Sequence, residues 1–270
     1  MTHTLLRTAL FVPGDRPDRF AKALGCGADT VIVDLEDAVE DARKEEAREH
    51  IRAFLEAQPK ARIRVRVNGA RHPGHAADLA LCAHPGIVGV LLPKAERAED
   101  VVGVATTCKP VWPVVESARG LAAVPEMAAV AGVERLTYGG LDLSADLGLS
   151  TGTDAAERIL DQVRFVLLLH SRLAGLAAPL ESVFPAMDDE PGLERFARNA
   201  GAMGFAGMLC IHPRQVPVVH AALAPSAEEV AWARRVVNAA AQGAGAFKVD
   251  GHMVDAPVVE RARRVLAAIV

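Results

Sequence analysis

The sequence predicts a (β/α)8 TIM barrel followed by a C-terminal appendage of helices and a hairpin. Eight short apolar runs alternate with longer helical patterns through the first 224 residues. The runs are apolar almost throughout, which is typical of parallel strands that are buried on both faces. Strands and helices that alternate over this length favour a closed barrel. An open doubly wound sheet is the alternative, and it is disfavoured because no Gly-x-Gly-x-x-Gly follows the first run.

The strands and helices of this barrel can be placed from the apolar runs and the periodic patterns between them. The expected strands are Thr8–Val12, Ala28–Val33, Ile63–Val67, Val88–Leu92, Pro110–Val115, Leu136–Tyr138, Ala177–Leu180 and Gly207–Ile211. The expected helices are Asp18–Leu24, Ala42–Ala57, Ala76–Cys82, Ala95–Thr106, Ala118–Ala131, Ala155–Ala174 and Leu193–Met203. Residues 1–224 are therefore expected to form a catalytic barrel.

Residues 225–270 are expected to form a lid or an oligomerisation arm. Ser226 is suited to cap a helix, and Gly243–Gly245 then breaks that helix. Phe247–Val254 alternates around Asp250–Gly251, which is a hairpin signal. A final helix is expected over Val258–Ile269.

The composition is that of a folded protein without a nucleic-acid or membrane surface. The 270 residues are 51% hydrophobic and 24% charged, which is ample for a core and excludes a disordered chain. Aromatic residues make up 4%, too few for a surface that stacks on single-stranded nucleic acid. The net charge is −4 and no long block of Lys and Arg is present, so we expect no nucleic-acid or membrane partner.

The sequence also predicts a cytoplasmic location. No apolar run reaches the roughly 18 residues that a membrane span requires, and Met1–Arg7 lacks the features of a signal peptide. Cys26, Cys82, Cys108 and Cys210 form no Cys-x-x-Cys pair. Free thiols in a reducing compartment are therefore expected.

Two carboxylates that follow neighbouring strands predict a metal site. Glu116 stands where the apolar strand Pro110–Val115 stops. Asp142 stands in the same way after Leu136–Tyr138 and a Gly139–Gly140 turn, about one β-α-β unit later. Carboxylates at the same end of adjacent parallel strands would form a hard-oxygen site. Two protein carboxylates with several waters suit Mg²⁺ or Mn²⁺ better than Zn²⁺.

Further charged residues are expected at the same end of the barrel. Six acids follow strand ends there, and they are Asp34, Glu36, Asp37, Glu116, Asp142 and Glu181. A structural barrel does not need so many like charges, and a divalent cation would relieve their repulsion. Arg66 can bind a substrate carboxylate in bidentate fashion, whereas Arg64 is expected to be a structural ion-pair partner. A metal beside an arginine could chelate a 2-oxo acid and stabilise an enolate.

Seven motifs in this order resemble the citrate lyase beta subunit-like proteins of the HpcH/HpaI aldolase superfamily. They are Leu10–Gly14, Asp34–Val39, Arg66–Asn68, Pro93–Lys94, Glu116–Gly120, Asp142–Gly148 and Ile211–Gln215. Each motif alone is weak, but together they span nearly the whole chain. The resemblance implies a Mg²⁺-dependent carbon–carbon lyase that acts on a short 3-hydroxyacyl-CoA thioester through a metal-stabilised enolate. Citryl-, malyl- and citramalyl-CoA are the expected kinds of substrate, and a homotrimer or hexamer is the expected assembly.

The resemblance also implies roles for individual residues. Glu116 and Asp142 correspond to the direct metal ligands. Glu116 is also expected to belong to the substrate-binding residues. Glu36 and Asp37 correspond to acids that hold metal-bound water. Arg66 corresponds to the clamp on the substrate carboxylate.

Three residues correspond less closely to parts of the acyl and CoA surface, namely Phe11, Arg16 and His212. In the tail, Asp255 corresponds to an aspartate that reaches the active site from a neighbouring subunit and acts as a base.

The sequence departs from the family pattern at two positions that bear on the acyl group. Leu141 stands where the family commonly has an acid before the second ligand, and Glu181–Ser182 stands where relatives often have an aspartate.

Other functions stay open at the same site. Hydrolysis of a CoA thioester, as by a malyl-CoA thioesterase, is one alternative. A non-catalytic subunit bound in a larger citrate lyase-like complex and an aldolase for free keto acids are the others.

Several of these residues also have a simple structural interpretation. Glu116, Asp142 and Asp37 could each begin a helix, and Asp255 could cap the last one. Lys94 could form a Schiff base, but a salt bridge fits better beside paired acids. His212 could merely form a hydrogen bond at the end of the barrel.

Overall fold

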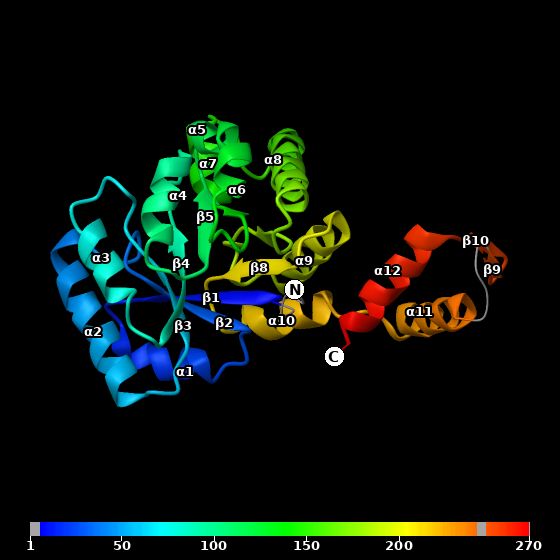
Figure 1. The fold of residues 1–270 in the computed structure, drawn as a ribbon, viewed down its shortest axis with the longest axis horizontal. Coiled ribbons are helices and arrows are strands. Elements are labelled where there is room, and N and C mark those ends of the chain that lie inside the picture. The colour runs from blue at the N-terminus through cyan, green and yellow to red at the C-terminus, as the bar shows by residue number, and fades with distance from the viewer. Residues whose placement is uncertain (1–5, 242–246, 270) are drawn as a thin grey trace. The chain divides into compact units, whose positions relative to one another are not determined.

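The fold is known from a computed structural model, which describes residues 6–241 and 247–269. The chain divides into two compact units, residues 1–222 and residues 223–270. The first unit is an eight-stranded barrel ringed by helices (Figure 1). Within the described residues, no helix is long and apolar enough to cross a membrane.

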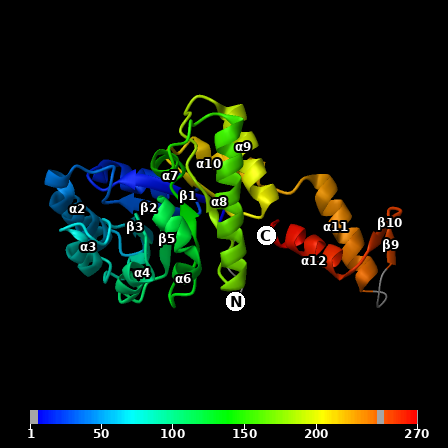
Figure 2. The ribbon, with the colours of Figure 1, turned by 90° about the horizontal axis from the view of Figure 1, so that it is seen from above.

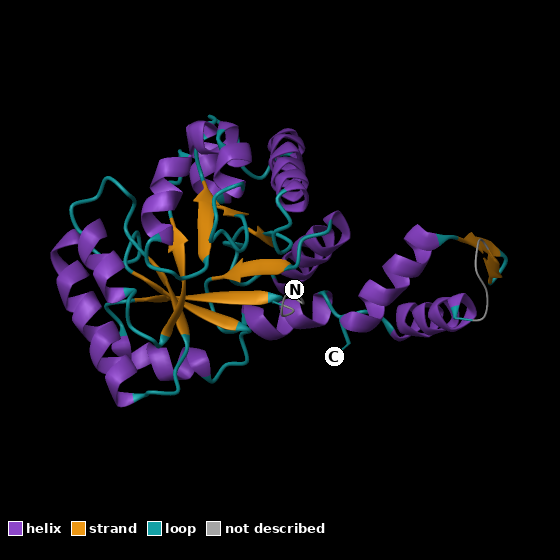
Figure 3. Cartoon of the chain, viewed as in Figure 1, coloured by secondary structure: helices purple, strands orange, loops and turns teal. Residues whose placement is uncertain are grey.

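The barrel closes in the simplest order for a (β/α)8 fold. Each strand pairs in parallel with the next one in the chain, and the last pairs with the first. The strands are β1 (Thr8–Pro13), β2 (Thr30–Asp34), β3 (Ile63–Arg66), β4 (Ile87–Leu92), β5 (Val111–Val115), β6 (Thr137–Tyr138), β7 (Leu180–Glu181) and β8 (Gly207–Cys210). The predicted TIM-barrel fold is therefore confirmed. Figure 3 shows these strands at the centre of the first unit, with helices outside them.

Helices cover the outside of the barrel because each carries an apolar stripe that packs on the strands. The longer ones are α2 (Lys44–Ala57), α4 (Ala98–Ala105), α8 (Asp154–Leu173), α9 (Glu190–Met203) and α10 (Gln215–Ala222). The shorter ones are α1 (Phe20–Leu24), α3 (His75–Leu81), α5 (Ala118–Ala122), α6 (Val124–Ala128) and α7 (Gly140–Asp146). In α2, for example, Ala47, Ile51 and Leu55 are buried at helical spacing.

Alternate residues of each strand point into the barrel and fill its interior. One core cluster contains Ile32 of β2, Leu91 of β4, Trp112 and Val114 of β5, and Leu180 of β7. Because side chains alternate along a strand, the neighbours of these residues face the helices. This alternation decides which strand-end side chains reach the open end of the barrel.

One predicted helix is divided in two, for a clear reason. The single helix expected over Ala118–Ala131 is two short helices, α5 and α6, that meet at Ala123. Pro125 lies in the first turn of α6, and its ring and missing N–H prevent α5 from continuing through it.

Two helices were not foreseen as separate elements. They are α7, which begins at Gly140, and α10, which contains Pro217 in its first turns. Both have sequences with low helix propensity, and their packing in the barrel stabilises them.

The second unit contains two helices and a hairpin with a small core. α11 (Ala227–Ala240) begins with a capping box formed by Ser226 and Glu229, and α12 (Ala256–Ala267) lies beside it (Figure 2). β9 (Phe247–Val249) and β10 (His252–Val254) pair as an antiparallel hairpin, as predicted. The predicted break at residues 243–245 lies outside the described residues. The expected role of this unit as a lid or an oligomerisation arm stays a prediction.

Candidate metal centre at the open end of the barrel

A cavity of about 720 Å³ lies at the carboxyl ends of the barrel strands. Most of the polar residues predicted for a site at this end line it. They include Glu36, Asp37, Asn68, Lys94, Glu116 and Asp142. The cavity therefore has a mainly acidic lining, in the place where barrels of this type carry their active sites.

Glu116 follows β5, and the pleat of that strand turns it towards the cavity. Val114 points into the barrel core, so the next residue faces outward and Glu116 faces inward again. Its side chain is buried, and Oε1 accepts a hydrogen bond of 2.6 Å from the backbone N–H of Lys94. Burial raises the pKa of Glu116 to about 7, with further contributions from the charges of Glu36 and Asp142.

Asp142 lies in the first turn of α7 and comes close to Glu116 at Gly139. A Cβ atom added to Gly139 would lie 2.6 Å from Glu116 Oε2 and 3.5 Å from Asp142 Oδ2. The two oxygens can therefore be no farther apart than the sum of those distances. The structure thus brings together the two predicted ligands, and their role in binding a metal stays a prediction.

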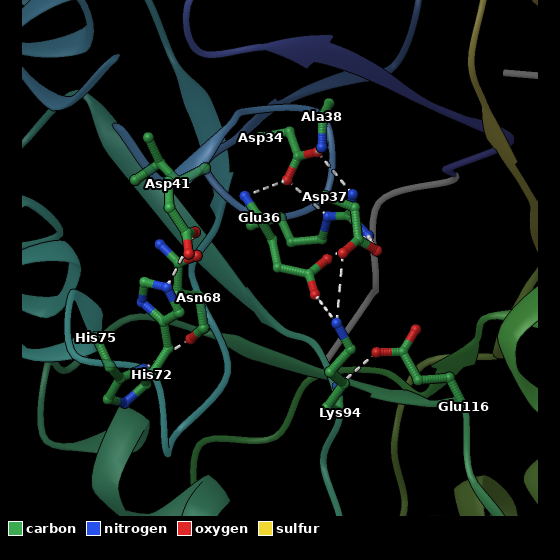
Figure 4. A network of polar contacts seen from close by, with 12 residues as sticks. Asp34, Glu36, Asp37, Ala38, Asp41, Asn68, His72, His75, Lys94 and Glu116 are labelled. Atoms are coloured by element: carbon green, nitrogen blue, oxygen red, sulfur yellow. Dashed lines mark hydrogen bonds and ion pairs between the residues drawn. The ribbon is translucent and has the colours of Figure 1, made fainter. Parts of the chain in front are cut away.

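Glu36 and Asp37 form a second acidic group that faces the amine of Lys94 (Figure 4). The Nζ atom of Lys94 donates to Glu36 and lies 3.3 Å from Asp37 Oδ1. Burial opposes the charge of Lys94, but these two acids outweigh it and raise its pKa. Lys94 is therefore protonated at neutral pH and forms the salt bridge expected of it, which disfavours a Schiff-base role.

Arg66 lies beside the same acids and is held in place by Asp34. Its Nε and Nη2 atoms donate to the two oxygens of Asp34 at 2.7 and 2.6 Å, a bidentate pair. Its Nη1 atom lies 3.0 Å from Glu36 Oε2, and its guanidinium carbon lies 4.9 Å from the centre of the Phe11 ring. Arg66 is therefore fixed in position, with one terminal nitrogen directed towards the acidic pair.

Four predicted residues of the first unit are not part of the cavity lining, namely Phe11, Arg16, Arg66 and His212. Arg16 is exposed and pairs with Asp18 at 2.9 Å. His212 is used locally, since its Nδ1 accepts from the backbone N–H of Arg214 at 3.1 Å. Asp255 belongs to the second unit, where it caps α12 by accepting from the N–H of Val258 at 3.3 Å. Their roles in substrate binding and proton transfer stay predictions.

Glu181 was expected at the open end of the barrel, but it faces the surrounding helices. Leu180 points into the barrel core, so Glu181 points outward. There it accepts a hydrogen bond of 2.8 Å from Arg164 Nε of α8 and another from the hydroxyl of Tyr138. This acid therefore holds β6, β7 and α8 together.

Sequence reasoning missed the residues that fix the start of α7. Ser182 Oγ accepts from the N–H of Gly140 at 2.8 Å, and Ser144 Oγ donates to the carbonyl of Gly140 at 2.6 Å. The Gly139–Gly140 pair was recognised only as a turn. A serine just after the neighbouring strand was the available signal for this clamp.

The residues of the cavity fit a small divalent cation. Among residues 6–241 and 247–269, no group of three or more His, Cys, Asp or Glu side chains is arranged to hold a metal. A site with two carboxylates, completed by water, is what Mg²⁺ usually occupies. Burial is the main cause of the raised pKa of Glu116, and the nearby charges of Glu36 and Asp142 add to it; a cation would offset that repulsion.

Comparison with known proteins gives a consistent result. The family model described as HpcH/HpaI aldolase/citrate lyase matches residues 7–213. A citrate lyase subunit beta-like protein of Mycobacterium tuberculosis is 42% identical over 95% of this chain and 93% of its own. A (3S)-malyl-CoA thioesterase of Cereibacter sphaeroides is 35% identical over 97% of this chain and 93% of its own.

A solved structure is similar over its whole length. It is the protein CitE from Mycobacterium tuberculosis in complex with magnesium, acetoacetate and coenzyme A. The TM-score is 0.87 and the sequence identity is 40%, over 98% of each chain.

Proposed function

This chain belongs to the HpcH/HpaI aldolase/citrate lyase family, and from that premise we propose that it is a Mg²⁺-dependent carbon–carbon lyase acting on a CoA thioester. The substrate would be a short 3-hydroxyacyl-CoA that carries a second carboxylate, of the citryl-, malyl- or citramalyl-CoA type. One observation carries the proposal: an oxygen of Glu116 and an oxygen of Asp142 lie close to the same point beside Gly139, and both residues line the acidic cavity.

Glu116 and Asp142 would hold the cation through Oε2 and Oδ2. When bound there, Mg²⁺ would supply Lewis acidity that polarises a ketone oxygen and offsets the negative charge of an enolate. Glu36 and Asp37 would orient water beside it. Lys94 holds these two acids in place, because its ammonium group contacts both.

Arg66 would orient the substrate carboxylate. Two of its nitrogens are committed to Asp34, which fixes the plane of the guanidinium group. The Nη1 atom is the one closest to the remaining acids, and it is the atom that would contact the substrate.

Asp255, either of the same subunit or of a neighbouring one, would move the proton on the acyl methyl group. Phe11, Arg16 and His212 would contribute to the surface for the acyl chain and CoA. The CitE structures with magnesium and acetoacetate or pyruvate support small keto acids as the other reactant. We further propose a cytoplasmic homotrimer or hexamer, which size-exclusion chromatography with light scattering would test.

A panel of CoA thioesters tests the proposal directly. Citryl-, malyl- and citramalyl-CoA would each be incubated with the protein, with Mg²⁺ or with EDTA, and the products separated by chromatography. We expect cleavage of at least one thioester to a keto acid and a shorter acyl-CoA, only with Mg²⁺. Glu116→Gln keeps the shape of the side chain but removes its charge, so turnover should fall at least about 10³-fold. Unchanged turnover in this variant would refute the assignment.

Thioester hydrolysis at the same site is the second candidate, favoured by the 35% identity to the (3S)-malyl-CoA thioesterase. The same panel separates the two functions. Malate plus free CoA, without acetyl-CoA or glyoxylate, would identify the hydrolase. A third possibility follows from the similarity to a citrate lyase subunit beta of Leuconostoc mesenteroides, and co-purification with an acyl-carrier partner would indicate it.

A further inference from the structure

Gly139 lies next to the two carboxylates on which the proposed function depends. Its backbone has φ −94° and ψ 92°, a conformation that residues with side chains also adopt. The backbone conformation therefore gives no reason for a glycine here. The reason has to be the space that a side chain would occupy.

An added Cβ atom shows which space this is. It would lie 2.6 Å from Glu116 Oε2 and 3.0 Å from Glu116 Cβ, both too close for non-bonded atoms, and 3.5 Å from Asp142 Oδ2. Apart from its chain neighbours, no other residue has an atom nearer to it than these three. A side chain at this position would therefore collide with the carboxylate of Glu116 and contact that of Asp142.

The backbone of Gly139 is held on both sides and has little freedom to move away. Its N–H donates to the carbonyl of Val115 in β5 at 3.1 Å. Its carbonyl accepts from the N–H of Leu143 in α7 at 2.9 Å. A clash at this point would therefore displace the carboxylate of Glu116 rather than the chain.

The two oxygens of Glu116 have different surroundings. Oε1 accepts the 2.6 Å hydrogen bond from the N–H of Lys94, whereas Oε2 is the oxygen that faces Gly139 and Asp142. Displacing the carboxylate would lengthen the bond to Lys94 and turn Oε2 away from Asp142. A single methyl group at residue 139 would thus disturb both.

We propose that Gly139 is a positioning residue of the metal centre, whose missing side chain keeps Glu116 Oε2 and Asp142 Oδ2 facing one open space. This inference rests on the proposed function, because it takes these two oxygens as the ligands of a divalent cation. Gly139 itself touches no reactant and acts only through Glu116 and Asp142.

Binding of Mg²⁺ alone, without substrate, tests the proposal by isothermal titration calorimetry. Gly139→Ala should weaken Mg²⁺ binding at least about tenfold, as is usual when the support of a metal ligand is disturbed. Gly103→Ala in α4 is the matched control, because an added Cβ there meets nothing within 4 Å. The control should bind Mg²⁺ within about twofold of the wild type. A folded Gly139→Ala protein with wild-type affinity would overturn the proposal.

A thermal double-mutant cycle without metal gives a second measurement and covers a variant that folds poorly. Gly139→Ala is made in the wild type and in Glu116→Ala, which removes the carboxylate it would strike. The loss of Tm on Gly139→Ala should be several degrees in the wild type and less than half of that in Glu116→Ala. Equal losses in both backgrounds would show that the side chain does not strike the carboxylate of Glu116, and would overturn the proposal.

The two experiments also separate this inference from the proposed function. A wild-type protein that binds no Mg²⁺ would overturn the proposed function, and with it the metal role of Gly139. A wild-type protein that binds Mg²⁺, together with a variant that binds it equally well, would overturn the role of Gly139 alone.

Discussion

Arg64 and Arg66 lie on the same face of β3, yet they differ in how many acids surround them. Arg64 has one acidic partner, with Nη2 at 2.8 Å from Glu134 Oε2, and its guanidinium carbon lies 4.0 Å from the centre of the Trp112 ring. Arg66 has three acids around it, of which Asp34 forms a bidentate pair. Burial lowers the pKa of Arg64, whereas the acids around Arg66 outweigh its burial and raise its pKa.

The difference shows that the two ends of the barrel carry opposite excess charges. Arg64 lies nearer the amino-terminal ends of the strands, which we call the closed end. There Gly89 lies opposite Arg64 in the sheet, and the guanidinium group of Arg64 covers Gly89. Arg64 and Arg135 both lie beside the Trp112 ring there, with Glu134 as the acid that acts on both, so positive charge is in excess. At the open end negative charge is in excess, which is the condition under which a cation binds.

The largest effect expected from this comparison is on stability. Arg66→Met should cost about 3–5 kcal/mol, because it leaves Asp34 buried without either of its charged hydrogen bonds. Arg64→Met should cost less, because its partner Glu134 is partly exposed and keeps the 2.6 Å hydrogen bond from Trp112. Urea unfolding of both variants measures the difference. Equal losses would mean that the two ends of the barrel contribute alike.

The next effect is a pH dependence of Mg²⁺ binding, which is expected at the open end of the barrel and not at the closed end. Because the pKa of Glu116 is raised to about 7, a proton occupies this carboxyl below that pH and competes with Mg²⁺. The affinity for Mg²⁺ should therefore fall about tenfold per pH unit below pH 7 and level off above it.

The closed end should not respond over the same range. Burial lowers the pKa of Arg135 there, to about 10, so it stays charged from pH 6 to pH 8. Titration calorimetry at several pH values, with Tm measured in EDTA alongside, checks this. An affinity that does not change between pH 6 and pH 8 would contradict the assignment of Glu116 as a ligand.

The smallest effect on stability is expected in the second unit, at Asp255. Asp255→Ala removes the cap on α12 and should cost about 1 kcal/mol, whereas Asp255→Asn keeps a capping side chain and should cost little. If Asp255 is also the base, both variants should lose turnover about 10²-fold or more. Melting curves and turnover measured on the same samples separate the two roles. Full turnover in Asp255→Asn would leave the cap as its only function.

Most strands of the barrel could be predicted from the sequence, because their residues are nearly all apolar. Runs such as Ile87–Leu92 are buried along their whole length, so a pattern of apolar residues locates them well. The short helices α7 and α10 were not predicted, because their glycine, proline and valine residues have low helix propensity. Packing against the barrel stabilises them, and a local sequence pattern gives no information about such packing.

The candidate site was foreseen in part for a similar reason. The position of Glu116 and Asp142 after two strands predicted that they would meet, and the structure places them around one glycine. Glu181 looked equivalent, but β7 is only two residues long, so its pleat could not be assigned from the sequence. The clamp of Ser182 on Gly140 joins two segments that are distant in the chain, and only the folded structure brings them together.

The protein has two tryptophans, and each compact unit contains one of them. Trp112 is fully buried in the barrel, while Trp232 of α11 packs against Arg261 of α12 at 5.1 Å. Each unit therefore carries its own intrinsic fluorophore. Emission from single-tryptophan variants would report whether the appendage melts together with the barrel or before it.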